Sequence, residues 1–157
     1  MSRGGQVQIE AVPVEVVLPL RRAILRANLP AEESTYAQDG MATTLHLAAR
    51  AADGEVVGVC TWFPDPLDGR DGWRLRGMAT SPQVRGTGVG ARLLAEGLAE
   101  GERRGLDLVW CQARTPAVGF YRRYGFVTVG QEFLAVHGIP HYLMVREAQP
   151  GAVGGGP

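Results

Sequence analysis

The stretch Gln83-Val84-Arg85-Gly86-Thr87-Gly88-Val89-Gly90 lies between a β-rich run, Trp73 to Thr80, and an amphipathic helical pattern that starts at Gly88. Its glycines let the backbone approach a ligand closely, and the first turn of a helix leaves N–H groups without intrahelical acceptors. Together with the helix dipole and the Arg85 guanidinium, these groups suit a phosphate or pyrophosphate. The alternative is a tight turn that needs glycine only for its dihedral angles.

The same glycines also satisfy the dinucleotide-binding pattern G-x-G-x-x-A over residues 86–91. In that fold the strand turns directly into the first glycine, whereas five residues separate Thr80 from Gly86 here. The next strand ends in Gln112-Ala113-Arg114 and not in the acidic residue that holds a ribose. The sequence contains no lysine, which excludes a Walker-type phosphate loop. Dinucleotide binding is therefore disfavoured.

Composition indicates a globular protein, with 45% hydrophobic and 20% charged residues among 157. We expect a single domain over residues 1–148 and a flexible Gly/Pro-rich tail over 149–157. The net charge is +0, so no basic excess points to a nucleic-acid partner. The N-terminus lacks a signal pattern and no apolar run approaches a membrane span, so we expect a cytoplasmic protein without a membrane partner.

Charge and cysteine distribution add two expectations. Ten acidic residues and six arginines precede residue 72, and the proportions reverse after it, which favours an anion-binding C-terminal half. The N-terminal half is correspondingly more acidic. Cys60 and Cys111 lie in apolar runs without metal or redox spacing, so we expect buried, reduced thiols and no metal site.

The hydrophobic periodicity predicts a mixed α/β sheet. Strands are predicted at residues 7–12, 45–50, 56–63, 73–80, 106–111, 126–136 and 141–146. A helix is predicted to begin at Pro19, with Leu20, Ile24 and Leu25 on its buried face and Arg21 outside it. Further helices are expected near residues 32–33, from Gly88 to the closing Gly105, and over 115–124.

Three segments in this order resemble the GNAT family of N-acetyltransferases. Gln83-x-x-Gly86-x-Gly88 matches the family's Q/R-x-x-G-x-G/A pyrophosphate signature, and the segment from Ala117 to Phe126 is similar to A-x-x-F-Y-x-x-x-G-F. The segment Gly138-Ile139-Pro140-His141-x-x-Met144 is similar to the ending of the ElaA-like branch. The resemblance covers roughly residues 15–147. It implies a GNAT fold, with a mixed, mostly antiparallel central sheet flanked by helices, and acetyl-CoA as the cofactor.

The resemblance also implies roles for individual residues. The backbone of Met78 and Ala79 would contact the pantetheine and the thioester carbonyl. Arg114 stands where many members place an asparagine that contacts the cofactor arm. Tyr121 would be the acid that protonates the departing CoA thiolate. The pyrophosphate would be held by Gln83, Arg85, Gly86, Thr87, Gly88, Val89 and Gly90.

Glu33 and His141 are both candidates for the base that deprotonates the acceptor amine. The alternative for Glu33 is a solvated surface glutamate, and the alternative for His141 is a structural residue of a turn. His46, inside an alternating strand, is expected to be a packing or substrate-wall residue. The implied reaction moves an acetyl group from acetyl-CoA to a primary amine, on a small molecule or a peptide, by direct attack in a ternary complex. The alternative is a non-catalytic acyl-CoA sensor or interaction module on the same fold. Homodimers are common in the family.

Overall fold

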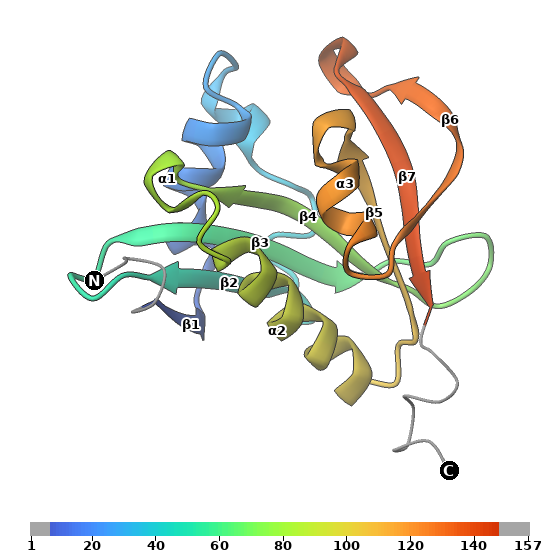
Figure 1. The fold of residues 1–157 in the computed structure, drawn as a ribbon, viewed down its shortest axis with the longest axis horizontal. Helices are drawn as coiled ribbons and strands as arrows, with labels where there is room; N and C mark the ends of the chain where they lie inside the picture. Colours follow the sequence, from blue (N-terminus) through green and yellow to red (C-terminus); the bar gives the residue numbers. More distant parts are fainter. Residues whose placement is uncertain (1–6, 148–157) are drawn as a thin grey trace. The chain divides into compact units, whose positions relative to one another are not determined.

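The computed structural model describes residues 7–147, which Figure 1 shows as a ribbon. Its strands are β1 (Gln8–Ala11), β2 (Leu45–Arg50), β3 (Val56–Pro64), β4 (Trp73–Thr80), β5 (Leu108–Arg114), β6 (Val127–Leu134) and β7 (Pro140–Glu147). Its helices are α1 (Val14–Leu25), α2 (Val89–Arg103) and α3 (Val118–Arg122). Short 3₁₀ segments are η2 (Ala31–Ser34), η3 (Pro82–Val84), η4 (Thr115–Ala117) and η5 (Val136–Gly138). The expected tail over 149–157 lies outside the described residues.

The strands are hydrogen-bonded in the order β1-β2-β3-β4-β5-β7-β6. The pairs β1–β2, β2–β3, β5–β7 and β6–β7 are antiparallel. This sheet with flanking helices confirms the expected fold class. The described chain forms two compact units: unit 1 comprises residues 7–64 and Leu75–Glu100, and unit 2 comprises Asp65–Arg74 and residues 101–147. The single domain over 1–148 stays a prediction.

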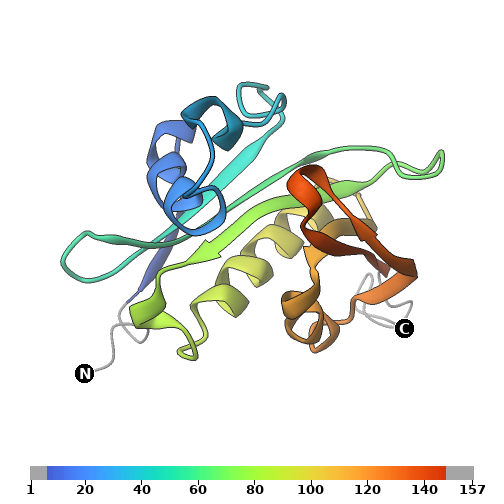
Figure 2. The same ribbon diagram turned by 90° about the horizontal axis from the view of Figure 1, so that it is seen from above.

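In unit 1, helices cover both faces of the strands. Val59 of β3 packs with Val17 of α1 in one buried cluster. The preceding residue, Gly58, faces Val89 and Leu93 of α2. Because successive strand residues point to opposite faces, α1 and α2 lie on opposite sides of β3, as Figure 2 shows.

Two glycines allow α2 to pack closely against β3. A Cβ on Gly97 of α2 would lie 1.9 Å from Cε2 of Trp62, which is fully buried on β3. A Cβ on Gly58 of β3 would lie 2.9 Å from Cδ1 of Leu93 on the helix. Each glycine therefore accommodates a large side chain of the opposite element. The helix that carries the glycine turn is fixed by this reciprocal fit.

Helix α1 begins at Val14, before the predicted start at Pro19. The predicted start rested on the apolar face formed by Leu20, Ile24 and Leu25, but the apolar spacing begins earlier and Pro19 lies inside the helix. The earlier start puts Val17, Arg21 and Ile24 on one face. Arg21 is completely buried, so the prediction that it lies outside the buried face was wrong.

In unit 2, β7 lies between β5 and β6. Trp110 of β5 is buried, its indole N–H donates to the Asp65 carbonyl at 2.9 Å, and the Arg74 guanidinium stacks on its ring at 4.4 Å. Strand β5 begins later than predicted because Leu106 still completes the end of α2, donating its N–H to the Gly101 carbonyl at 2.9 Å. The helix predicted over 115–124 is shorter, with the 3₁₀ turn η4 before α3.

Candidate active site

The glycine turn that precedes α2 has the left-handed backbone that its sequence requires. Gly86 and Gly88 have φ of +82° and +89°. Between them the Thr87 N–H donates to the Val84 carbonyl at 3.2 Å, and the Thr87 hydroxyl donates to the same oxygen. Helix α2 follows at Val89, so the amides of its first turn have no intrahelical acceptor.

The outer side of this turn is open. A Cβ on Gly86 or Gly88 would meet nothing within 4 Å. Glycine is therefore required at these two positions by the backbone conformation and not by a lack of space for a side chain. Val84 and Val89 are buried and anchor the turn at both ends, while Arg85 between them is exposed. The arrangement presents amides, a helix N-terminus and a cation to solvent together, which suits an anion.

Gln83, the first residue of the signature, lies at the edge of this turn. It is exposed, and its side-chain amide donates to the exposed Glu55 carboxylate at 3.4 Å. Gly90, in the first turn of α2, is half-buried. Unit 1 therefore brings all seven residues of the expected pyrophosphate site into one continuous segment.

Strand β4 contains a backbone irregularity next to the residues expected to hold the thioester. Gly77 has φ of +68°, a left-handed backbone conformation within a strand, which is the conformation that a glycine adopts in many β-bulges. The next residue, Met78, is half-buried, and Ala79 is buried against Val17 of α1. The Met78 and Ala79 amides thus follow a glycine whose conformation other residues rarely adopt.

Tyr121 lies on α3 in unit 2 and is 6% exposed. Its ring makes edge contacts with Phe120 and Phe126, with centroids 5.1 and 5.4 Å apart. Its carbonyl accepts the N–H groups of Tyr124 and Phe126 at 2.9 and 3.2 Å, which ties the end of the helix to the following strand. The tyrosine is therefore held rigidly from both its ring and its backbone.

The remaining expected site residues are divided between the units. Arg114 and His141 are register partners at the β5–β7 end in unit 2. His141 Nδ1 is 2.8 Å from the Ile139 carbonyl, and its ring stacks on Phe133 at 6.0 Å. Glu33 is exposed on η2 of unit 1. The turn, Met78, Ala79 and Glu33 thus belong to unit 1, and Tyr121, Arg114 and His141 belong to unit 2.

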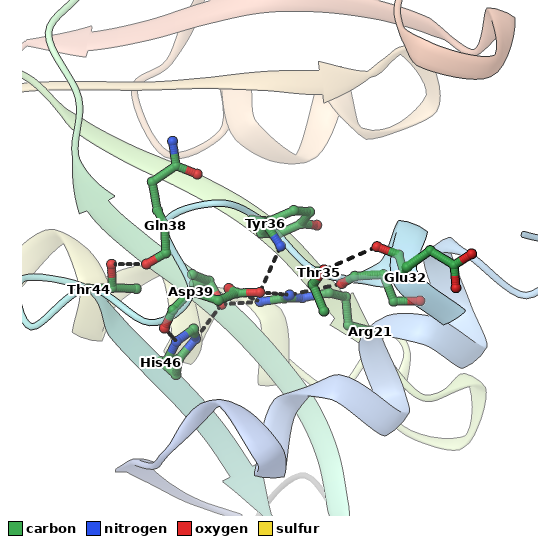
Figure 3. A network of polar contacts seen from close by, with 10 residues as sticks. Arg21, Glu32, Thr35, Tyr36, Gln38, Asp39, Thr44 and His46 are labelled. Carbon is green, nitrogen blue, oxygen red and sulfur yellow. Dashed lines mark hydrogen bonds and ion pairs between the residues drawn. The ribbon is translucent and has the colours of Figure 1, made fainter. Parts of the chain in front are cut away.

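Unit 1 also contains a buried polar network that the sequence analysis did not anticipate (Figure 3). Arg21 donates to both Asp39 carboxylate oxygens, at 2.8 and 3.1 Å, to the Thr61 hydroxyl at 2.7 Å and to the Ser34 carbonyl at 3.0 Å. His46 is buried and lies 2.8 Å from the Thr61 hydroxyl and 3.0 Å from the Asp39 carbonyl. The network ties the segment after η2 to α1, β2 and β3.

Tyr36 is the aromatic member of this network. Its N–H donates to the Asp39 carboxylate at 2.8 Å, and the guanidinium groups of Arg21 and Arg76 lie 4.1 and 3.8 Å from its ring centroid. One sequence signal could have revealed the network. Arg21 lies four residues after Val17 and three before Ile24, so it falls on the apolar stripe of a helix that begins before Pro19.

The two cysteines are buried and reduced, as expected. Burial raises the pKa of the Cys60 thiol to about 12, and it raises the pKa of the Cys111 thiol to about 12 as well. A thiolate is the nucleophilic form of cysteine, so neither side chain is suited to attack a thioester at neutral pH.

Residues 17–126 match the acetyltransferase (GNAT) family, and the chain belongs to this family. Over 141 residues it is 27% identical to the uncharacterized N-acetyltransferase YitI of Bacillus subtilis (strain 168), which covers 88% of this chain and 93% of the relative. An acyl-CoA N-acyltransferase from Pseudomonas aeruginosa has a TM-score of 0.72 at 25% identity, covering 89% of this chain and 99% of that chain. Escherichia coli ElaA shares the fold, with a TM-score of 0.68 at 21% identity over 90% of this chain and 99% of its own.

These comparisons confirm the resemblance recognised in the sequence and give acetyl transfer as the general class of activity. Among the helices of residues 7–147, none is both long and apolar enough to cross a membrane.

Proposed function

We propose that this protein is an N-acetyltransferase that uses acetyl-CoA and acetylates a primary amine by direct attack in a ternary complex. The observation that carries the proposal is the geometry of unit 1. There, the left-handed Gly77 precedes the Met78 and Ala79 amides, and the open glycine turn precedes α2. Oriented amides stabilise a developing oxyanion, and a helix N-terminus binds phosphate.

In the proposed reaction, the neutral amine attacks the thioester carbonyl carbon and forms a C–N bond. Negative charge grows on the carbonyl oxygen, where an amide of Met78 or Ala79 would donate a hydrogen bond. The intermediate then collapses, the C–S bond breaks, and CoA leaves as a thiolate that Tyr121 protonates. A thiol titrates near 8.5 and a phenol near 10, so the thiolate leaves readily and Tyr121 orients and completes the transfer.

The amine must lose a proton before or during attack, and we assign this role to Glu33 or His141. Glu33 is exposed on η2, whereas His141 is half-buried with Nδ1 directed at the Ile139 carbonyl. A carboxylate and an imidazole differ in the pH at which they lose activity as bases. The acidic limb of the kcat/KM profile, compared between Glu33→Gln and His141→Gln, distinguishes the two.

Thermal unfolding during an acetyl-CoA titration tests the cofactor, with NADPH as the control ligand. At a hundred times its Kd, a ligand adds about 2.7 kcal/mol to the unfolding free energy, a rise in Tm of several degrees for a chain of this size. Stabilisation by acetyl-CoA alone supports the proposal. Stabilisation by NADPH alone would support the dinucleotide interpretation and overturn it.

Release of CoA from acetyl-CoA, measured with methylamine, spermidine, phenylethylamine and triglycine, tests turnover. We expect Tyr121→Phe to lower kcat at least tenfold without changing the Kd of acetyl-CoA, because the phenol acts on the leaving group. Equal activity would remove Tyr121 from the mechanism. If the protein binds acetyl-CoA but releases no CoA with any of these amines, the result would favour the non-catalytic sensor.

A further inference from the structure

The ring of Tyr36 is held in one place by three sets of contacts within unit 1. The guanidinium groups of Arg21 and Arg76 pack on the ring, and the Tyr36 N–H donates to Asp39. Asp39 is itself fixed by two bonds from Arg21. A side chain that is 8% exposed and held on its ring and its backbone has little freedom to rotate.

The hydroxyl end of this ring lies against the irregular residue of β4. A Cβ on Gly77 would lie 3.2 Å from the Tyr36 hydroxyl oxygen and 3.1 Å from Arg21 Nε. Gly77 directly precedes Met78, one of the two residues whose amides are proposed to hold the thioester oxygen. The Tyr36 hydroxyl therefore lies against the residue that directly precedes the amides proposed to hold the thioester oxygen.

Within residues 7–147, the two guanidinium groups contact the ring of Tyr36 and its backbone N–H donates to Asp39, so these contacts do not use the hydroxyl. A phenol hydroxyl can accept one hydrogen bond while it donates another. A rigid acceptor beside an electrophilic carbon can take an N–H of an incoming amine and direct the nitrogen lone pair toward that carbon.

We propose that the Tyr36 hydroxyl contacts the acceptor amine and orients it for attack, and that Arg21 and Asp39 are positioning residues that hold Tyr36 for this task. The inference rests on the proposed function, because it needs the thioester to lie at Met78 and Ala79. It adds a substrate contact on the side of β4 that faces α1. The segment after η2 then forms part of the wall of the acceptor site.

The test is Tyr36→Phe, which keeps the ring and both guanidinium contacts and removes only the hydroxyl. The matched control is Tyr124→Phe, since Tyr124 is 39% exposed at the end of α3. CoA release is measured with the best amine among methylamine, spermidine, phenylethylamine and triglycine. We expect kcat/KM for the amine to fall roughly tenfold in Tyr36→Phe, the effect of one lost hydrogen bond, and to stay unchanged in the control.

The Kd of acetyl-CoA and the Tm of Tyr36→Phe are measured in parallel and are expected to match the wild type. If the amine kcat/KM is unchanged, the inference fails while the proposed function stands. If the Kd of acetyl-CoA rises as much as the amine kcat/KM falls, Tyr36 has a structural role and the inference fails. If the wild-type protein binds acetyl-CoA but acetylates none of the amines, the proposed function fails first and the inference with it.

Discussion

Asp39 supplies the negative charge that compensates the buried guanidinium of Arg21, and the substitution Asp39→Asn removes that charge with little change in shape. The Arg21 side chain is 0% exposed and that of Asp39 is 9% exposed. Removing one partner of a buried ion pair costs about 3–5 kcal/mol, because the other charge stays buried without compensation. The Ser34 carbonyl and the Thr61 hydroxyl remain as neutral acceptors, so we expect the low end of this range, about 3 kcal/mol.

Urea unfolding followed by tryptophan fluorescence measures this loss, and a thermal scan should show Tm lower by about 6–12 °C. The matched control is Glu10→Gln. The Arg50–Glu10 pair has the same 2.8 Å separation as Arg21–Asp39, but its side chains are 35% and 45% exposed. An exposed pair contributes at most about 1 kcal/mol. If both substitutions lower the unfolding free energy equally, burial is not what makes the Arg21–Asp39 pair important, and the reasoning is refuted.

Three further predictions follow from the glycines and the cysteines. Gly97→Ala should lower the unfolding free energy by about 3 kcal/mol in urea, because its Cβ would overlap the Trp62 indole, whereas Gly119→Ala, which meets nothing within 4 Å, should cost far less. Gly88→Ala should weaken acetyl-CoA binding about tenfold in a titration, because φ of +89° strains alanine by about 1–2 kcal/mol. The control Gly40→Ala, where a Cβ meets nothing within 4 Å, should bind acetyl-CoA as the wild type does. If the two variants bind acetyl-CoA with equal affinity, the proposed anion site is contradicted. At pH 8 a pKa of about 12 leaves roughly 10⁻⁴ of each cysteine as thiolate, so a disulfide reagent should label Cys60 and Cys111 only after unfolding, and rapid native labelling would show that they are accessible.

The features that could be predicted from the sequence are those set by local chemistry. Alternation of apolar residues gave the strands, and the stripe that includes Leu93 gave α2. The glycine turn was predictable because Gly86 and Gly88 meet a local need for positive φ. The same local argument gave the left-handed Gly105 that ends α2.

The features that escaped prediction depend on residues far apart in the chain. Arg21 and Asp39 are separated by eighteen positions, and Arg21 and Thr61 by forty, so no window of sequence contains the buried network. Tyr36 lies in a segment that reads as polar and turn-rich, and only the fold brings it to Gly77. A buried arginine also contradicts the usual exposure of charged residues, which tertiary pairing overrides here.

The reciprocal glycine contacts between α2 and β3 determine how the turn before α2, the proposed anion site, can respond to a ligand. If α2 shifted along its axis by one residue, a side chain would replace Gly97 against the Trp62 indole. The close contact therefore holds the helix at one position along its axis. Binding of an anion at the first turn of α2 is therefore not expected to shift the helix along its axis. The proposed anion site is therefore rigid, and a substitution at the exposed Arg85 would change its charge without repacking the protein beneath it.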